Sequence, residues 1–343
     1  MKVLLYFENE GVFKKSGMGR ALQHQKKALS LVGIEYTTDK NDTFDIAHVN
    51  TYNSQSIKLV NKCVKNGVPV IVHGHSTKED FRNSFSFWKL LEGSINSAIE
   101  KTYSKPDLII TPTPYSKRLI EGYDFVSCPV VNISNGIDLD KYANAVVTQE
   151  DNKALREKFK IGLNEKIVMG IGWMFERKGF HDFISLAKEF PDIKFIWFGQ
   201  KNKILNTKII NKAIDNKTPN VLLPGYVDQD TIIKMLHMAD VFLFPSYEET
   251  EGIVILEALA TKTPILVRDI GVFDYLTDGV DCYKAKDNDE FKSKITYILN
   301  NDCSDVLEKG FKVAEERDLQ IIGTLLKEQY ERVINMHKKN EWY

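Results

Sequence analysis

The sequence predicts an α/β fold in which two doubly wound parallel sheets face each other across a cleft. Short β-branched runs alternate with amphipathic stretches along the chain, which is the pattern of βα units in parallel sheets. The apolar runs form two series, and this favours two sheets over one long sheet. The length of 343 residues also exceeds what one hydrophobic core usually serves.

The predicted strands are short and recur in both series. They lie near residues 1–7, 45–49, 68–73, 107–112 and 129–133, then near 166–171, 193–198, 220–223, 240–245 and 264–268. A polar stretch from Leu139 to Lys158 separates the series and is interpreted as a connection with a short helix and a hinge near residue 145. We therefore expect an N-terminal domain of residues 1–145 and a C-terminal domain of residues 146–318, with ligands bound between them.

The end of the chain predicts one more amphipathic helix, and the segment of about residues 319–343 can pack back on the N-terminal domain. Apolar residues recur there at helical spacing, so one face of the helix is expected to be buried. The residues assigned to that face are Ile321, Leu325, Leu326, Tyr330, Val333 and Ile334. The pattern alone does not decide which domain the helix contacts.

Charge and cysteine content argue against several classes of protein. Lys and Arg number 46 against 47 Asp and Glu, and no strongly basic domain of the kind that binds nucleic acid stands out. The four cysteines lie far apart without zinc-site spacing, so we expect reduced thiols rather than a metal site. The first apolar run is too short for a secretory signal, and no window reaches the ~18 apolar residues of a spanning helix. We expect a cytoplasmic protein that is peripheral on the inner face of the cell membrane.

The most specific stretch lies at residues 244–260. A buried strand ends at Pro245, a polar turn follows, and a helix begins near Gly252. The start of a helix offers backbone N–H groups and a positive dipole end, which favour a diphosphate. Glu249 precedes the helix and Glu257 lies inside it, so the two carboxylates flank that anion site and suit a hexose and a ribose. The alternative is one acid at a helix start and another on a solvated face.

The pattern Pro-Ser-x-x-Glu-x-x-Gly-x-x-x-x-Glu-Ala, which starts at Pro245, resembles the signature of the family 4 glycosyltransferases. These enzymes have the GT-B fold of two facing Rossmann-like domains. The spacing of Glu249 and Glu257 matches the signature. The resemblance implies that Glu249 contacts the sugar of a nucleotide-sugar donor and that Glu257 contacts its ribose.

A second segment, residues 170–179, resembles the family's Gly-Arg-x-x-x-x-Lys-Gly pattern, whose two cations neutralise the donor diphosphate. Lys178 matches the lysine. Trp173 stands where the arginine is expected, and Arg177 is the neighbouring cation that can compensate. Without the resemblance, adjacent cations before a helix indicate only a solvated turn.

Strand-end turns complete the predicted donor site. Gly199 and Val227 follow two predicted strands, and both turns are expected to face the cleft. The resemblance implies that the second turn holds the nucleobase through backbone atoms. The donor-binding residues that we predict are Gly17, Arg177, Lys178, Gly199, Val227, Glu249, Thr250, Gly252, Ile253 and Glu257.

Two segments of the first half also carry candidate site residues. Ser16 to Arg20 opens a helix but fails as a dinucleotide fingerprint, because a third glycine and a placed acid are missing. It resembles the family's Gly-Gly-x-x-Arg loop instead, in which Gly17 approaches the donor phosphates or the acceptor. A buried strand ends in His73 and His75. The resemblance assigns to His75 a contact with the donor sugar near its anomeric centre, whereas strand-end histidines otherwise are often structural.

A turn and an aspartate pair precede the expected hinge. Asn135-Gly136-Ile137-Asp138 resembles the family's Asn-Gly-Val-Asp turn. Asp138 and Asp140 also mimic the Asp-x-Asp metal site of the other major glycosyltransferase fold. We expect no metal here, because the resemblance implies that helix dipoles and cations stabilise the leaving group.

Aromatic residues and cations interleave just after the candidate histidine. Phe81, Arg82, Phe85, Phe87, Trp88 and Lys89 are predicted to bind the acceptor or the membrane. Such a segment can lie in a membrane interface beside a lipid-linked acceptor. The alternative is a core helix with a solvated rim.

Taken over nearly the whole chain, the motifs resemble bacterial glycolipid synthases that add a second hexose to glucosyl-diacylglycerol. The resemblance implies a retaining, metal-independent hexosyltransferase without a cofactor, with His75, Glu249 and Lys178 as its catalytic residues. The expected donor is UDP-glucose or UDP-galactose, and the expected acceptor is a membrane glycolipid such as monoglucosyl-diacylglycerol. Alternatives are another cell-envelope or soluble sugar acceptor, a nucleotide-sugar epimerase, or a two-lobed binding protein. The oligomeric state is left open.

Overall fold

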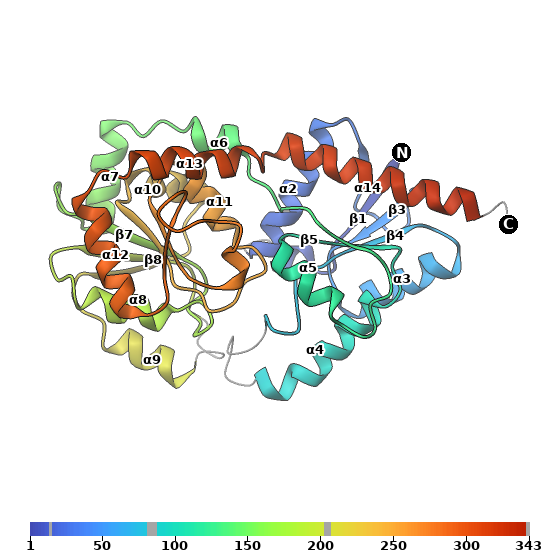
Figure 1. Ribbon diagram of the computed structural model, residues 1–343, viewed down its shortest axis with the longest axis horizontal. Coiled ribbons are helices and arrows are strands. Elements are labelled where there is room, and N and C mark those ends of the chain that lie inside the picture. The colour runs from blue at the N-terminus through green and yellow to red at the C-terminus, as the bar shows by residue number, and fades with distance from the viewer. Residues whose placement is uncertain (14–15, 81–87, 202–206, 341–343) are drawn as a thin grey trace.

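The computed structural model describes residues 1–13, 16–80, 88–201 and 207–340. In these residues the chain forms two parallel six-stranded sheets with helices on both faces (Figure 1), which confirms the predicted α/β class. The strand orders are β2-β1-β3-β4-β5-β6 and β12-β11-β10-β7-β8-β9. Each order reverses direction beside the first strand of its series, as a doubly wound sheet requires.

The first half contains the sheet β1–β6. Its strands are β1 (Lys2–Tyr6), β2 (Glu35–Thr37), β3 (Ile46–Val49), β4 (Val70–His73), β5 (Leu108–Thr111) and β6 (Val130–Asn132). Its helices are α1 (Glu10–Phe13), α2 (Gly17–Leu31), α3 (Ser54–Lys65), α4 (Trp88–Tyr103) and α5 (Pro114–Glu121). Every residue of β3, β4 and β5 is buried, because helices cover both faces of the sheet.

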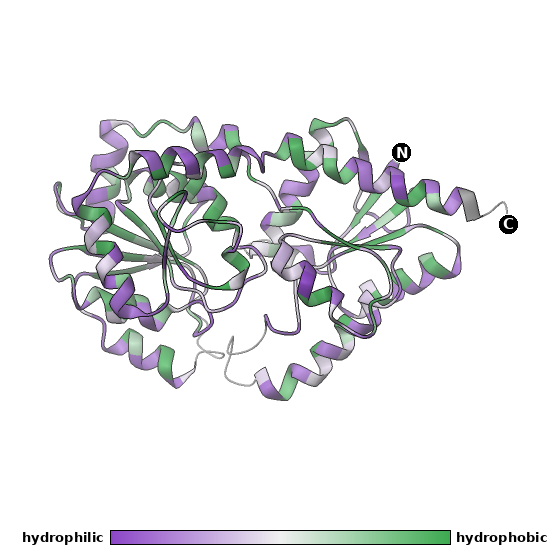
Figure 2. Cartoon of the chain, in the orientation of Figure 1, coloured by the Kyte–Doolittle hydropathy of each residue, from purple (hydrophilic) through white to green (hydrophobic). Residues whose placement is uncertain are grey.

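The second half contains the sheet β7–β12. Its strands are β7 (Ile167–Ile171), β8 (Lys194–Phe198), β9 (Val221–Gly225), β10 (Val241–Phe244), β11 (Ile265–Arg268) and β12 (Tyr283–Ala285). Its helices are α7 (Gln149–Phe159), α8 (Phe180–Ala187), α9 (Lys208–Asp215), α10 (Gln229–Met238), α11 (Ile253–Ala260), α12 (Asn288–Asn300) and α13 (Ser304–Glu315), with a short 3₁₀ turn η1 (Gly271–Phe273). Figure 2 shows the strands as the hydrophobic centre of each half.

The chain crosses between the halves at two adjacent places. The first crossing leads into helix α6 (Leu139–Ala143), and Ile137 and Tyr142 already pack in the core of the second half. At the second crossing, Asp318 pairs with Ile137 in a parallel bridge, and helix α14 (Leu319–Asn340) then lies over the first half (Figure 1). The two connections are therefore hydrogen-bonded to each other where they cross between the halves.

Helix α14 packs against α2 with most of the predicted face. Leu326, Tyr330 and Val333 are buried in the core of the first half, as are Leu319 and Ile322. Ile334 is partly buried against the same core, whereas Ile321 and Leu325 remain 43% and 37% exposed, so the prediction was wrong for these two residues only. Gly323 lies against the Ala28 carbonyl, where a Cβ would collide with the backbone, and this close approach fixes the rotation of α14.

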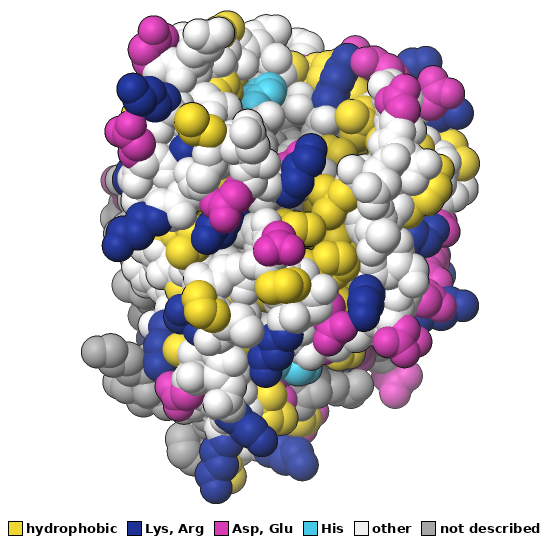
Figure 3. Space-filling view, turned by 90° about the vertical axis from the view of Figure 1, so that its left-hand side faces the viewer, with side chains coloured by type: hydrophobic (Ala, Val, Ile, Leu, Met, Phe, Trp, Pro, Cys, Tyr) yellow, Lys and Arg dark blue, Asp and Glu magenta, His cyan; other side chains and the backbone are white. Residues whose placement is uncertain are grey.

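The end of the molecule formed by the second half carries a mixed surface. Figure 3 shows Lys and Arg side chains interspersed with Asp and Glu on this face, without a large area of one sign. Within the described residues, none of the helices is both long enough and apolar enough to cross a bilayer.

Candidate active site

The loop from Pro245 to Gly252, between β10 and α11, joins the two halves. The Tyr115 hydroxyl donates to the Glu248 carboxylate at 3.0 Å, and the Thr113 hydroxyl donates to the Thr250 carbonyl at 2.8 Å. The Asn135 side-chain amide donates to the Glu251 carboxylate at 2.8 Å. These first-half partners follow β5 and β6, so the loop contacts the carboxyl edge of the first sheet, where ligands bind in open α/β folds.

Glu249, a buried residue of this loop, forms an ion pair with the mostly buried Lys178. The Ser246 hydroxyl donates to the same carboxylate at 2.8 Å. Burial alone would raise the pKa of Glu249, but Lys178 and Arg177 outweigh it and hold that pKa below its usual value. Burial lowers the pKa of Lys178, against the opposing effect of Glu249. The structure thus brings two predicted donor-site residues into direct contact.

Arg177 lies beside the same pair. Its guanidinium donates to Asp80 at 2.9 Å and to the Glu248 carbonyl at 2.7 Å, and it lies 3.9 Å from the Glu249 carboxylate. Trp173 stacks instead on the ring of Phe175, with centroids 5.7 Å apart. Arg177 therefore provides a cation next to Glu249, whereas its action on a donor stays a prediction.

Helix α11 begins where the sequence predicts a helix start. Gly252 precedes it with φ of +80°, a conformation that side-chain-bearing residues rarely adopt. Gly252 has no side chain that could cap the first N–H groups of α11. Inside the helix Glu257 is fully buried and pairs with Arg20 of α2, so it does not lie on a solvated face.

His75 follows β4 and is buried near the same loop. Its Nε2 lies 2.9 Å from the Asn50 side-chain oxygen, and its carbonyl accepts a hydrogen bond from the Thr250 hydroxyl at 3.2 Å. The ring stacks on His73, with centroids 4.0 Å apart. Burial lowers the pKa of His75 to about 3, so its imidazole is neutral at physiological pH and serves as a hydrogen-bonding group.

The remaining donor-site residues lie at the same edges of the sheets. Gly199 follows β8 with φ of +142°, and its backbone is so close to the Gly172 carbonyl that a Cβ would collide. Val227 follows β9 and is partly buried, and Ile253 is the buried first residue of α11. Gly17 is the exposed first residue of α2.

The predicted acceptor segment is only partly visible. Phe81, Arg82, Phe85 and Phe87 lie outside the described residues, while Trp88 and Lys89 begin α4. The next two residues, Leu90 and Leu91, are 78% and 48% exposed. The alternative of a core helix therefore does not hold for the first turn of α4, where these leucines are exposed.

The aspartate pair before the hinge has an ordinary structural role. Asp138 forms an ion pair with Lys27 at 2.6 Å, and Asp140 lies in the first turn of α6. In the part of the chain that the structure describes, no three or more His, Cys, Asp or Glu side chains cluster as a metal site would need.

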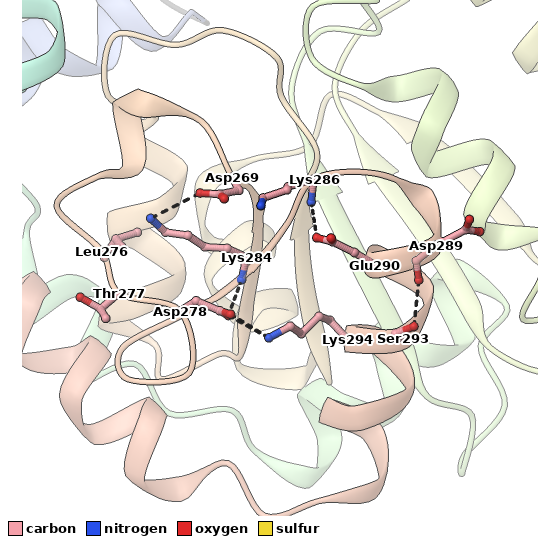
Figure 4. A pocket seen from close by; sticks show the side chains of 10 residues that line it. All are labelled: Asp269, Leu276, Thr277, Asp278, Lys284, Lys286, Asp289, Glu290, Ser293 and Lys294. Carbon is pink, nitrogen blue, oxygen red and sulfur yellow. Dashed lines mark hydrogen bonds and ion pairs between the residues drawn. The ribbon is translucent and has the colours of Figure 1, made fainter.

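A cavity of about 710 Å³ lies near the ends of β11 and β12 and the start of α12 (Figure 4). Its lining consists of Asp269, Leu276, Thr277, Asp278, Lys284, Lys286, Asp289, Glu290, Ser293 and Lys294. Lys294 pairs with Asp278 at 2.9 Å, and Lys284 lies 4.0 Å from Asp269. None of the predicted site residues lines this cavity. Its charged side chains form ion pairs mostly with one another.

Sequence reasoning missed the first-half partners of the site. Asp80 and Arg20 had no predicted role, although Arg20 is the arginine of the loop that resembles Gly-Gly-x-x-Arg. Tyr115 had no role either. Their partners in the second half lie 97 to 237 positions away in the chain, so no local pattern marks them.

Solved structures share this architecture over the whole chain. The Anabaena protein HepE in complex with UDP and glucose has a TM-score of 0.76 at 16% identity, covering 97% of this chain and 100% of that chain. Sucrose-phosphate synthase from Thermosynechococcus elongatus has a TM-score of 0.79 at 15% identity, covering 98% and 100%. The protein therefore has the fold of the GT-B glycosyltransferases.

Sequence comparison identifies the family. The model of group 1 glycosyl transferases matches residues 151–314, and that of glycosyltransferase family 4 matches residues 26–141. The chain is 48% identical over 339 residues to the processive diacylglycerol alpha-glucosyltransferase of Acholeplasma laidlawii, covering 98% of this chain and 100% of the relative. It is 28% identical to the alpha-galactosylglucosyldiacylglycerol synthase of Streptococcus pneumoniae strain R6, covering 73% and 67%. The chain belongs to the family 4 glycosyltransferases, and it is a glycosyltransferase.

Proposed function

We propose that the protein transfers a glucosyl group from UDP-glucose to monoglucosyl-diacylglycerol in the membrane, with retention and without a metal or cofactor. The observation that carries the proposal is the ion pair of Lys178 and the buried Glu249 beside the start of α11, with Glu257 inside that helix. Glucose and a diacylglycerol acceptor are favoured by the activity named for the relative that is 48% identical. UDP-galactose is the second candidate donor, because a galactosyl-transferring synthase is also among the relatives.

The proposed donor site works by exchanging ionic partners. The diphosphate binds at the start of α11 and takes Lys178 as its counter-ion. Glu249 then loses its cation and accepts hydrogen bonds from hydroxyls of the hexose. Lys178 and the helix start stabilise the negative charge that develops on the leaving UDP, which is electrostatic catalysis of an oxocarbenium-like transition state.

Retention follows from the configurations of donor and product. UDP-glucose carries an α-linked glucose, and an α-glucoside product, such as the relative's name indicates, keeps that configuration. In the proposed complex Glu249 accepts hydrogen bonds from the hexose hydroxyls, and Asp80 stays paired with Arg177, so neither carboxylate is assigned the role of a nucleophile. His75 is a weak base, because burial lowers its pKa to about 3, so it is not suited to take the proton either. We infer that a phosphate oxygen of the donor accepts the proton of the attacking hydroxyl.

The start of α4 supports a membrane-bound acceptor. Leu90 and Leu91 are exposed next to Trp88 and Lys89, a combination suited to the boundary between lipid headgroups and acyl chains.

Radiolabelled donors and a panel of acceptors test the proposal. We expect the purified protein to transfer glucose from UDP-glucose to monoglucosyl-diacylglycerol in vesicles, and the labelled lipid to yield an α-glucoside. EDTA should leave this rate unchanged. Transfer only to a soluble sugar would refute the lipid acceptor, and interconversion of the donor without any acceptor would indicate an epimerase.

A further inference from the structure

Glu257 is held by a residue of the opposite half of the molecule. It lies in α11 with its side chain fully buried, and its Oε1 accepts a hydrogen bond from the Arg20 guanidinium of α2. The two residues are 237 positions apart in the chain. The Glu257 charge is the largest cause that raises the pKa of Arg20. This ion pair therefore spans the two halves.

The second oxygen of the same carboxylate is unsatisfied. Glu257 Oε2 is buried and finds no hydrogen-bond partner among the described residues. The Tyr142 hydroxyl lies beside this carboxylate, because after burial the Glu257 charge is the next cause that raises the pKa of Tyr142 and a hydrogen-bond interaction with Glu257 also contributes; the same hydroxyl accepts from Gln229 at 2.9 Å. A buried carboxylate oxygen without a donor is costly, so this oxygen is suited to a ligand hydroxyl.

We propose that Arg20 is a positioning residue for donor recognition: it engages one oxygen of Glu257 and thereby presents the other to the ribose hydroxyls. The inference rests on the proposed function, in which Glu257 binds the ribose. Arg20 belongs to the first half and Glu257 to the second, so recognition of the ribose requires contact between the halves. The ribose is then bound only when the first half contacts the second half through Arg20.

Removing the guanidinium has a specific consequence. A buried carboxylate without its counter-charge is strongly disfavoured, so in Arg20→Gln the Glu257 side chain turns away or binds a proton. Either change removes the acceptor for the ribose hydroxyls. The contacts of Lys178 and α11 with a diphosphate stay intact, and the loss therefore affects one part of the nucleotide only.

The test measures the affinity of the full chain for UDP and for 2′,3′-dideoxyuridine diphosphate by calorimetry. The unaltered protein is expected to bind UDP at least about tenfold more tightly, since hydrogen bonds to a charged group are at stake. Arg20→Gln and Glu257→Gln should each weaken UDP binding by roughly ten- to a hundredfold and leave the dideoxy nucleotide within about threefold. The double variant should bind UDP no more weakly than either single variant, because both act through one contact.

Lys27→Gln is the matched control. Lys27 lies on α2 as Arg20 does, and its partner Asp138 lies outside the proposed site, so the ribose preference should persist in this variant. If Arg20→Gln does not fold, Arg20→Lys keeps the charge but loses the planar fork and should lower the preference in part.

Other outcomes overturn the inference. An equal loss for both nucleotides in Arg20→Gln would mean that Arg20 acts on the phosphates. An unchanged ribose preference in that variant would mean that Arg20 has no part in recognition. If the unaltered chain does not bind UDP at all, the proposed donor fails, and this inference fails with it.

Discussion

The charged side chains predicted to touch the donor are paired with opposite charges in the structure. Lys178 pairs with Glu249, and Glu257 pairs with Arg20. Such pairs keep a buried site neutral and ordered, since an isolated buried charge is disfavoured by several kcal/mol. A diphosphate that binds to Lys178 replaces one anionic partner by another, and Glu249 becomes available to the sugar.

Substitution of Lys178 tests this exchange. We expect Lys178→Gln to lower kcat roughly 10²- to 10³-fold, because a cation that faces the leaving diphosphate is lost. Steady-state transfer assays measure the effect, and Lys188→Gln, at an exposed position after α8, serves as a control. Unchanged turnover in a folded Lys178→Gln protein would exclude the proposed role.

A second prediction concerns pH. Because burial lowers the pKa of His75 to about 3, its imidazole stays neutral throughout the working range. His75→Gln should reduce kcat/KM by about ten- to a hundredfold through a lost hydrogen bond, by the same factor between about pH 5.5 and pH 8.5. A factor that varies more than about tenfold over this range would indicate a titrating His75 instead.

At the level of residues, the motifs predicted local structure in the second half but not the partners of its charged side chains. A helix start near Gly252 was predicted, and α11 begins at Ile253 as expected, while the anion site there stays a prediction. The pairing of Glu257 with Arg20 could not be predicted, because the residues lie 237 positions apart and local periodicity carries no information on such distances.

Among the elements, the start of α4 is the one most directly tied to the proposed acceptor. We expect the double substitution Leu90→Glu and Leu91→Glu to reduce binding to lipid vesicles by at least about tenfold, since each buried apolar side chain is worth roughly 1.5–3 kcal/mol. Vesicle sedimentation measures this, with binding of UDP unaffected.

The control for α4 is an apolar residue of similar exposure on the other half. Leu163 is 75% exposed, and Leu163→Glu should not alter vesicle binding. If the α4 variant sediments with vesicles as well as the unaltered protein does, another surface must contact the membrane.

Strand prediction succeeded for the central strands and failed at the sheet edges. Ten strands follow the predicted apolar runs, whereas β2 and β12 were missed. Both are edge strands of three residues, and a segment that short, with polar and apolar residues mixed, shows no periodic pattern. Ile321 and Leu325 of α14 were wrongly assigned to the buried face, because the apolar residues span more than one side of that helix and tertiary packing selects between them.

For the whole molecule, the contact between the halves depends on pH through Glu248. Burial, together with Asp80, raises the pKa of Glu248 to about 7 while Tyr115 and Arg177 oppose the rise. The folded protein then holds a proton that the unfolded chain has lost above about pH 4.5, so stability falls as pH rises from there to about 7.

Glu248→Gln should remove this dependence. The variant should be more stable than the unaltered protein at about pH 8 by roughly 1 kcal/mol, a value reduced for partial solvent screening, with little difference at about pH 4.5. Thermal unfolding at both pH values measures the effect, and Glu121→Gln, an exposed position on α5, is the control. A variant that is less stable at the higher pH would contradict the assignment.

The central claim is that a nucleotide sugar lies between the halves, against the start of α11. A crystal structure of the protein with UDP tests it most directly. We expect the diphosphate within hydrogen-bond reach of Lys178 and the first N–H groups of α11, and the ribose in contact with Glu257. UDP bound elsewhere, for example in the cavity near Lys284 and Lys294, would show that this donor site is wrong. The same conclusion would follow if UDP bound here but the Glu249 and Glu257 side chains pointed away from it.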